Sequence, residues 1–247
     1  MMFIGLIRLW GQLNMQKVLS DDFDNRTKLL LGDDFDKLAN KKIAICGLGG
    51  VGSIIPLAMV RSGIKNLVLI DFDKVDVTNL NRQIAYDLSN VNQRKVDATE
   101  EKILKLRKDL IVQKYFNKID SSFDFSVFNK LDFVFDCIDD IDAKVSLIEY
   151  LASHNIPFIS SLGMGNRLDS TKVMITTINK TTGDPLAKKL RHLLKEKEVD
   201  LSKVPVSFSS ENPLKNGRII SSMIFVPNSS GLAMASYAIK VLVNKGE

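Results

Sequence analysis

The chain has 247 residues with 34 Lys or Arg, 29 Asp or Glu and 2 Cys, and its formal net charge is +5. A content of 45% hydrophobic and 26% charged residues is ordinary for a globular protein and excludes collagen-like or low-complexity chains. Two cysteines are too few for a disulfide framework, and without a Cys-x-x-Cys pair we expect no zinc and a reducing, cytoplasmic compartment. The excess of basic residues favours an anionic partner. No stretch reaches the ~18 apolar residues of a membrane span, so we expect no membrane association.

Short apolar runs alternate with amphipathic segments through the first two thirds of the chain. The runs are bounded by breakers, which is typical of strands buried on both faces of a sheet. Pro56 lies inside one of the predicted helices, so that helix is expected to kink or to begin late. The alternation predicts an α/β fold with a Rossmann-like, doubly wound, mainly parallel sheet. The predicted strands are 42–46, 66–71, 131–136 and 157–160, and the predicted helices are 51–61, 93–110 and 141–154.

The pattern changes in the last third of the chain. A β-branched run at 172–178 predicts a strand, and we expect the additional strands of this half to be antiparallel. The helix predicted at 184–198 begins with an Asp-Pro pair and has one basic face. Two prolines and five serines predict an exposed loop at 204–222. A helix at 228–244 is apolar nearly all round, which predicts that it is buried or at an interface.

A glycine-rich loop joins the first predicted strand to its helix. The sequence Gly47-Leu48-Gly49-Gly50-Val51-Gly52 fits G-x-G-x-x-G, in which glycines allow a tight turn and a close approach of the backbone to a phosphate. The helix that follows supplies free N–H donors and a positive dipole end. Asp71 ends the next strand about twenty residues on, where a carboxylate accepts from a ribose hydroxyl. These features fit a nicotinamide dehydrogenase as well as an ATP-binding enzyme.

Three charged residues further along the chain favour ATP. Arg82 and Lys95 are expected near the carboxyl ends of the strands, close to the glycine loop, where two fixed cations suit a triphosphate whose charge builds during transfer. Asp139 follows a further strand, where a carboxylate can hold Mg²⁺ against phosphate oxygens. Each of them alone is typical of a solvated surface charge. Their order and spacing together predict a site for ATP and Mg²⁺.

The strings GLGGVGS, LIDFDKVDVTNLNRQ and DCID, together with Lys95, resemble the ATP-binding domain of the ubiquitin-activating and ThiF/MoeB-type adenylating enzymes. The resemblance covers about residues 24–161 and implies a homodimer that uses ATP and Mg²⁺. It implies that Arg26, on an N-terminal helix, reaches into the ATP site of the partner subunit. The nucleotide ligands that it implies are Gly47, Gly49, Gly50, Gly52, Asp71, Asp73, Asn79, Arg82, Gln83 and Lys95. The catalytic residues that it implies are Arg82, Lys95, Asp139 and Arg26, with Asp139 as the magnesium ligand.

The second half of the chain resembles one branch of that family, the tRNA threonylcarbamoyladenosine dehydratases (the TcdA/CsdL group). IPFISSLGMG, DPLAKKLR and VSFSSE carry this resemblance, and the last two are the more discriminating. It implies ATP-dependent cyclisation of N6-threonylcarbamoyladenosine at position 37 of tRNA, in which the carbamoyl group of the substrate attacks its own adenylated carboxylate. Cys46 and Cys137 are interpreted as buried packing residues, which agrees with a reaction that needs no protein nucleophile.

The basic helix is a candidate tRNA contact, because lysine and arginine neutralise phosphates without reading sequence. Its candidate residues are Lys188, Lys189, Arg191 and Lys195. The alternative is an ordinary solvated helix face beside Glu196 and Glu198.

The domain organisation is predicted as follows. Residues 1–20 form an extension that is either disordered or the product of an upstream start site, and 21–247 form a single adenylation domain. Its nucleotide-binding half is expected at about 40–161 and its substrate and dimer half at about 162–247. Three other functions stay open: activation of the C-terminal carboxylate of a ubiquitin-like sulfur carrier, a NAD-dependent dehydrogenase, and a non-catalytic partner that only binds nucleotide or RNA.

Overall fold

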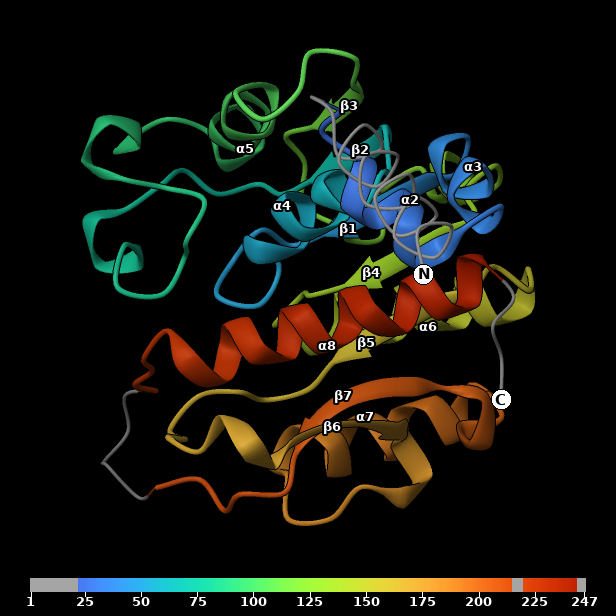
Figure 1. The fold of residues 1–247 in the computed structure, drawn as a ribbon. Coiled ribbons are helices and arrows are strands. Elements are labelled where there is room, and N and C mark those ends of the chain that lie inside the picture. The colour runs from blue at the N-terminus through green and yellow to red at the C-terminus, as the bar shows by residue number, and fades with distance from the viewer. Residues whose placement is uncertain (1–21, 215–219, 244–247) are drawn as a thin grey trace, which may run out of the picture.

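The computed structural model describes residues 22–214 and 220–243, which form a mainly parallel sheet with helices on both faces (Figure 1). Within these residues the sheet has seven strands in the order β3-β2-β1-β4-β5-β7-β6. All neighbouring pairs are parallel except β6 and β7. This arrangement confirms the predicted fold class. The strands are β1 Lys42–Cys46, β2 Asn66–Ile70, β3 Ile111–Tyr115, β4 Phe133–Asp136, β5 Phe158–Ser161, β6 Val173–Thr177 and β7 Pro205–Ser209.

Helices cover the two faces of the sheet as separate layers, each with its own apolar core. One core joins the sheet to α4, α5 and α8, and the other joins it to α6 and α7. In Figure 1, α8 runs across the sheet between α4 and the strands β6 and β7. The helices are α2 Asn25–Leu31, α3 Asp34–Ala39, α4 Ile54–Arg61, α5 Lys95–Leu104, α6 Ile141–Ser153, α7 Pro185–Glu196 and α8 Phe225–Leu242.

The side chains of β1 show why the central strands are continuously apolar. Ile43 and Ile45 face the layer that contains α4 and α8, whereas Ala44 and Cys46 face the layer that contains α6. All four side chains are buried. Successive side chains of a strand point to opposite faces, so the positions of a strand that is covered on both sides are mostly apolar. These runs were therefore recognisable in the sequence.

The prediction of a loop at 204–222 was wrong in its first part. β7 occupies Pro205–Ser209 and lies inside the sheet between β5 and β6. Its serines are buried, and the Ser207 hydroxyl shares a 2.8 Å hydrogen bond with the Ser230 hydroxyl of α8. Pro205 is tolerated because it is the first residue of the strand. Serines that are satisfied by a neighbouring helix look like loop residues in a sequence, which is why the strand was missed.

The helix predicted at 93–110 is shorter than expected, because α5 ends at Leu104. The chain then turns and enters the edge strand β3, which the apolar pattern did not reveal because most of its side chains are exposed. The helix predicted at 51–61 begins at Ile54, so Pro56 lies in its first turn. A late helix start, not a kink, therefore accommodates the proline.

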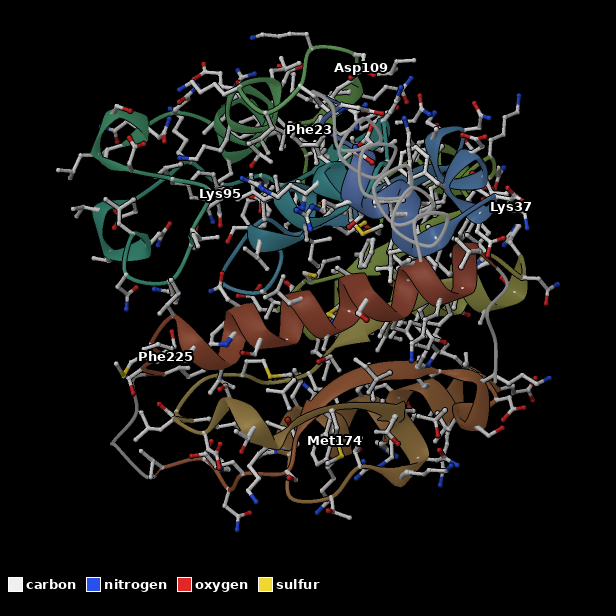
Figure 2. The ribbon with its side chains drawn as sticks, in the orientation of Figure 1. Phe23, Lys37, Lys95, Asp109, Met174 and Phe225 are labelled. Carbon is white, nitrogen blue, oxygen red and sulfur yellow. The ribbon has the colours of Figure 1, made fainter. Side chains whose placement is uncertain are left out.

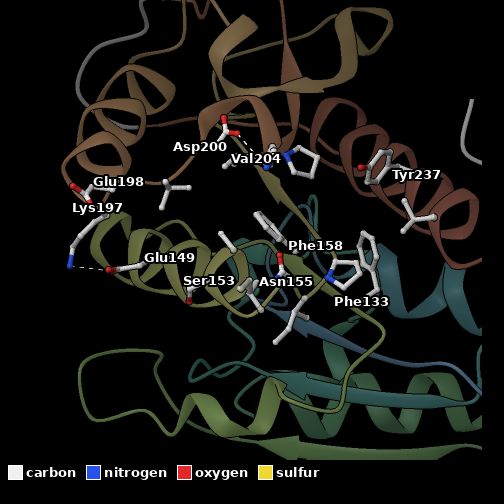
Figure 3. A pocket seen from close by; sticks show the side chains of 18 residues that line it. Phe133, Glu149, Ser153, Asn155, Phe158, Lys197, Glu198, Asp200, Val204 and Tyr237 are labelled. Atoms are coloured by element: carbon white, nitrogen blue, oxygen red, sulfur yellow. Dashed lines mark ion pairs between the residues drawn. The ribbon is translucent and has the colours of Figure 1, made fainter.

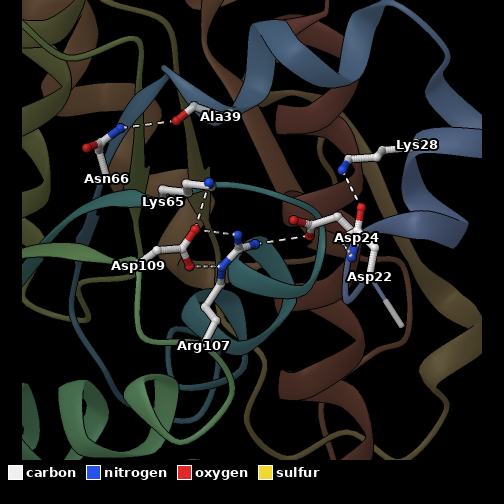
Figure 4. A network of polar contacts seen from close by, with 8 residues as sticks. All are labelled: Asp22, Asp24, Lys28, Ala39, Lys65, Asn66, Arg107 and Asp109. Atoms are coloured by element: carbon white, nitrogen blue, oxygen red, sulfur yellow. Dashed lines mark hydrogen bonds and ion pairs between the residues drawn. The ribbon is translucent and has the colours of Figure 1, made fainter. Parts of the chain in front are cut away.

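Ion pairs attach the N-terminal helices to the body of the domain (Figure 4). The Arg107 guanidinium donates to Asp24 at 3.0 Å and to Asp109 at 2.7 Å, and Lys65 pairs with Asp109 at 2.7 Å. The arginine side chain is only 8% exposed, so these contacts fix the chain directly before α2. The extension predicted at 1–20 lies outside the described residues. Among the described helices, none has the length and hydropathy needed to cross a membrane.

Candidate active site

A cavity of about 810 Å³ opens at the carboxyl ends of β1, β2, β4 and β5. The strand order reverses at this point, because β2 lies on one side of β1 and β4 lies on the other. Open α/β sheets bind ligands at such reversals. Almost the whole predicted nucleotide set lines this cavity. The predicted residues that line it are Gly47, Gly49, Gly50, Asp71, Asp73, Asn79, Arg82, Gln83, Lys95 and Asp139.

The glycine loop is closed tightly by its first and last glycines. Gly47 has φ +88°, and a Cβ at Gly52 would lie 1.8 Å from the Gly47 carbonyl oxygen. Gly52 therefore supports the loop from behind and does not line the cavity. A Cβ at Gly49 would meet nothing within 4 Å, so the backbone there is open to a ligand. This cradle, together with the N-terminus of α4, fits the phosphates of a nucleotide.

Asp71 lies at the base of the cavity and is only 7% exposed. Its carboxylate accepts from the Leu48 N–H at 2.6 Å and from the Asp73 N–H at 2.7 Å. Burial raises the pKa of Asp71, and Lys95 and the two N–H donors oppose that rise. The residue thus holds the glycine loop in place, and its predicted contact with a ribose hydroxyl stays a prediction.

The two predicted cationic side chains, Lys95 and Arg82, are held in different ways. Lys95 is 4% exposed, and its ammonium lies 2.7 Å from the carboxylate of Asp73, which acts as its counter-ion. Lys95 is the first residue of α5, where Figure 2 labels it. Arg82 is partly exposed and donates through Nη1 to the Thr78 carbonyl at 3.0 Å and to Asn81 at 2.9 Å. Its remaining donors are available to a phosphate.

α8 helps to fix the backbone around Arg82. The buried Asn228 amide donates to the Arg82 carbonyl at 2.8 Å, and a Cβ at Gly231 would lie 2.4 Å from the Val51 carbonyl oxygen. Asn79 caps a 3₁₀ turn, because its side-chain oxygen accepts from the Asp76 N–H at 3.3 Å. The segment after β2 is therefore held by α8 and by its own capping box.

Gln83 is an orphaned polar group at the cavity. The residue is 3% exposed, and its Oε1 has no hydrogen-bond partner among the described residues. A buried acceptor without a partner costs free energy, so it points to a donor that a ligand brings. Phosphate oxygens cannot supply that donor, whereas a ribose hydroxyl or an adenine amine can.

The adjacent residues Asp139 and Asp140 differ in their contacts. Asp140 caps α6 by accepting from the Asp142 and Ala143 N–H groups at 3.1 Å, and these contacts together with Lys118 lower its pKa. Asp139 is exposed in the cavity. The described residues contain no cluster of three or more metal-binding side chains. A single carboxylate completed by phosphate oxygens and water is a common way to hold Mg²⁺, so the donor set fits that ion when ATP is present.

The two thiols are poorly suited to nucleophilic attack. Cys46 is fully buried in the core, and Cys137 lies at the inner edge of the cavity. Burial raises the pKa of both thiols above the usual range, so the reactive thiolate is disfavoured at neutral pH.

The remaining predicted residues lie away from the cavity. Arg26 is exposed on α2 and does not line the cavity of its own chain. Lys188, Lys189 and Lys195 are exposed on α7. Arg191 differs from these lysines, because its Nη1 donates to the Ile178 and Thr181 carbonyls at 3.3 and 3.0 Å. It attaches α7 to the turn after β6 through this one nitrogen of its guanidinium.

Sequence reasoning missed some residues that line the cavity. Lys118 follows β3 at its carboxyl end and pairs with Asp140 at 3.1 Å. Recognition of the edge strand would have placed this lysine at the same end of the sheet as Asp71. The loop after β5, which includes Gly163 and Met164, also lines the cavity.

A second cavity of about 600 Å³ lies at the other end of the sheet, where β4 and β5 begin (Figure 3). Phe133, Phe158 and Tyr237 line it, and Lys197 pairs with Glu149 at 3.1 Å on its rim. None of the predicted site residues is among those that line it. The cavity at the carboxyl ends of the strands is therefore the candidate active site.

Comparison with known proteins agrees with this geometry. The pattern of the ThiF family matches residues 24–247. The tRNA threonylcarbamoyladenosine dehydratase of Bacillus subtilis is 34% identical over 243 residues, which cover 89% of this chain and 94% of that protein. The crystal structure of the Escherichia coli tRNA N6-threonylcarbamoyladenosine dehydratase in complex with ATP superposes with a TM-score of 0.84 at 31% identity, covering 89% of this chain and 93% of that one. The chain belongs to the ThiF family of adenylating enzymes.

Proposed function

We propose that this chain is an ATP-dependent tRNA threonylcarbamoyladenosine dehydratase, which cyclises N6-threonylcarbamoyladenosine at position 37 of tRNA. The observation that carries the proposal is one cavity in which the glycine loop, Arg82, Lys95 and Asp139 converge. The similar proteins from B. subtilis and E. coli bear this name, and the former is matched over 94% of its length. A nicotinamide dehydrogenase explains the glycine loop but not the two cations and the exposed carboxylate.

In the first step, an oxygen of the threonine carboxylate attacks the α-phosphorus of ATP, and pyrophosphate leaves. Lys95 and Arg82 offset the negative charge that builds on the phosphates, and the open backbone at Gly49 approaches them. Asp139 would hold Mg²⁺, which neutralises phosphate charge. The product is an acyl-adenylate whose leaving group is AMP.

In the second step, the carbamoyl group of the same nucleoside attacks the activated carbonyl carbon, and AMP leaves. The nucleophile and the electrophile belong to one molecule, so correct positioning makes the step effectively unimolecular. The net change in the nucleoside is the loss of one water. No protein thiol takes part, in keeping with the raised pKa values of Cys46 and Cys137.

We further infer a homodimer in which Arg26 serves the ATP site of the partner subunit. Arg26 is exposed on α2, beside Leu29 and Leu30, which are 59% and 80% exposed. Two such leucines on one short helix favour a surface that another protein covers. The exposed lysines of α7 would contact tRNA phosphates, and a tRNA substrate with ATP implies a cytoplasmic enzyme.

The proposal is tested by incubating the purified protein with ATP and threonylcarbamoyl-modified tRNA, and then measuring the mass of the digested nucleoside. We expect a nucleoside lighter by one water, formed only with ATP and accompanied by AMP and pyrophosphate. An unchanged nucleoside from protein that binds ATP contradicts the substrate assignment. Pyrophosphate exchange that requires a ubiquitin-like sulfur carrier instead of tRNA would select the alternative function.

A further inference from the structure

One wall of the candidate active site is formed by residues that carry no charge. Leu162, Gly163, Met164 and Gly165, which follow β5, line the cavity together with Leu186 and Ile220. Phosphates require cations or free N–H donors, which this apolar wall does not offer through its side chains. It suits an uncharged group, such as the nucleoside part of a substrate, better than a triphosphate.

Arg167 is buried behind this wall and its side chain is 3% exposed. Its Nη1 donates to the carbonyl oxygens of Gly163 and Gly165. Its Nε donates to the Glu211 carbonyl at 3.0 Å, and its Nη2 donates to Asp184 at 3.4 Å. One guanidinium therefore fixes the backbone of the wall from inside the protein.

Two partners hold this arginine and its loop in place. Asp184 is 1% exposed in its side chain, and its other oxygen caps α7 by accepting from the Ala187 N–H at 3.0 Å. The Glu211 carboxylate accepts from the Leu168 N–H at 3.0 Å and from the Asp169 N–H at 2.9 Å. Asp184 begins the DPLAKKLR string and Glu211 ends the VSFSSE string, so the two discriminating segments of the sequence meet at this loop.

Asn166 extends the same arrangement to the segment before α8. Its side-chain oxygen accepts from the Ser221 N–H and hydroxyl, both at 2.8 Å, and its carbonyl accepts from the Leu214 N–H at 2.7 Å. Asn166 has φ +57°, a conformation that asparagine tolerates better than most residues. Ile220, which lines the cavity, is thus tied to the loop that Arg167 organises.

A buried ion pair is a poor way to gain stability, because removing two charges from water offsets their attraction. Arg167 directs three of its four contacts to backbone carbonyls, two of them in the cavity wall itself. Among the described residues, its contacts do not include the glycine loop, Asp71 or Lys95, which form the nucleotide side of the cavity. The wall and the nucleotide side are therefore organised by separate contacts.

We propose that Arg167, held by Asp184 and Glu211, is a positioning residue that shapes the wall on which the threonylcarbamoyl nucleoside of tRNA lies, without serving ATP binding. The inference rests on the proposed function. Arg167 touches neither reactant and acts through the backbone from Gly163 to Gly165. Its removal displaces that wall and misaligns the carboxylate with the α-phosphorus.

The test compares Arg167→Met with Arg61→Met, which removes an exposed arginine at the far end of α4 that donates to the Leu57 carbonyl within its own helix. The ATP dissociation constant is measured by equilibrium binding, and kcat and KM are measured with modified tRNA. For Arg167→Met we expect an ATP affinity within about twofold of wild type and a kcat/KM for tRNA lowered by about 100-fold, the size of loss that a small misplacement produces. Arg61→Met should match wild type in both measurements.

Arg167→Lys separates positioning from folding, because lysine keeps the charge opposite Asp184 but cannot form the forked bonds to the carbonyls. We expect this variant to regain the wild-type melting temperature while its kcat/KM for tRNA stays low. The Arg167→Lys variant also provides the test if Arg167→Met does not fold. Recovery of tRNA turnover together with stability, an unchanged kcat/KM in Arg167→Met, or an equal loss of ATP affinity would each overturn the inference. If the wild-type protein leaves the nucleoside mass unchanged, the proposed function is wrong. If the wild-type protein is active but the Arg167 variants do not behave as expected, only the inference about Arg167 is wrong.

Discussion

The two sides of the active-site cavity are built in different ways. The nucleotide side consists of charged side chains at the carboxyl ends of the strands, such as Asp71, Lys95 and Asp139, which line the cavity themselves. The substrate side consists of backbone and apolar groups that Arg167 holds through contacts to distant segments, including Glu211. A side that stabilises charge needs particular side chains, whereas a side that fits a nucleoside needs a particular shape. Substitutions should therefore affect the two sides separately.

The largest expected loss of rate tests the nucleotide side. Arg82→Ala and Lys95→Ala should each lower pyrophosphate release by about 100- to 1,000-fold, because each removes a charge that stabilises the transition state. Binding of the modified tRNA, measured by filter retention, should change little. Arg61→Ala is the matched control, since its arginine lies away from the cavity. Wild-type turnover in either cavity variant would refute its assignment.

A buried ion pair lies between the nucleotide side and the substrate side of the cavity, so its removal should affect both sides. Lys144 and Asp136 are both fully buried, with 2.7 Å between ammonium and carboxylate, and Ser160 of β5 donates to the same carboxylate oxygen at 2.6 Å. The other oxygen of Asp136 accepts from the Ile138 N–H at 3.1 Å, beside Asp139. Lys144→Met should lower the free energy of unfolding by about 3–5 kcal/mol, because it leaves an unpaired buried charge.

The Lys144→Met loss is measured by urea denaturation, and we expect ATP affinity and tRNA turnover to fall together. The double variant Lys144→Met with Asp136→Asn should recover part of the stability, since no buried charge then lacks a partner. A double variant no more stable than Lys144→Met would show that the pair is not the source of the loss.

The contribution of a second subunit can be tested by complementation. Arg26→Ala and Arg82→Ala should each be inactive alone. Each mixed dimer contains one site with both arginines intact and one site with neither. About half of the dimers in an equal mixture are mixed, so about a quarter of wild-type activity should return if the dimer is symmetric. Activity is measured as AMP formation after the subunits have exchanged. A mixture as inactive as its components would mean that Arg26 does not act across subunits.

The smallest expected effect concerns the exposed lysines of α7. Lys188→Ala and Lys189→Ala should each raise the KM for tRNA without changing ATP affinity. Each should also reduce the slope of log affinity against log salt by about one, as expected for one lost phosphate contact. Lys37→Ala is a matched control on α3, because this lysine is also exposed and pairs with nearby Asp34. An unchanged salt slope would identify the face of α7 as ordinary solvated surface.

The nucleotide side was predictable from sequence because its signals are local. Gly47 and Gly52 must be glycine for steric reasons, and the motif spacing places Asp71 and Lys95 at the carboxyl end of the sheet. The fold class followed from β1, β2, β4 and β5, which are apolar because helices cover both faces. These features are recognised from motif spacing and apolar runs, without knowledge of which side chains contact one another.

The substrate side was not predictable because its organising contacts join distant segments. Arg167 and Glu211 are 44 positions apart, and an arginine in a loop resembles a surface residue until its acceptors are known. The strand β7 was missed because its buried serines find partners within the protein, Ser207 at Ser230 of α8 and Ser209 at the Glu211 N–H. The edge strand β3 was missed because its side chains are mainly exposed, and Lys118 was missed with it.

The central claim is that the threonine carboxylate is activated by attack on the α-phosphorus of ATP. The most direct measurement uses modified tRNA whose threonine carboxylate carries oxygen-18, followed by mass spectrometry of the released AMP and pyrophosphate. We predict that one labelled oxygen appears in AMP, because the oxygen that attacks phosphorus leaves with AMP when the ring closes. Labelled phosphate or pyrophosphate with unlabelled AMP would contradict it, because activation would then have occurred at another phosphorus.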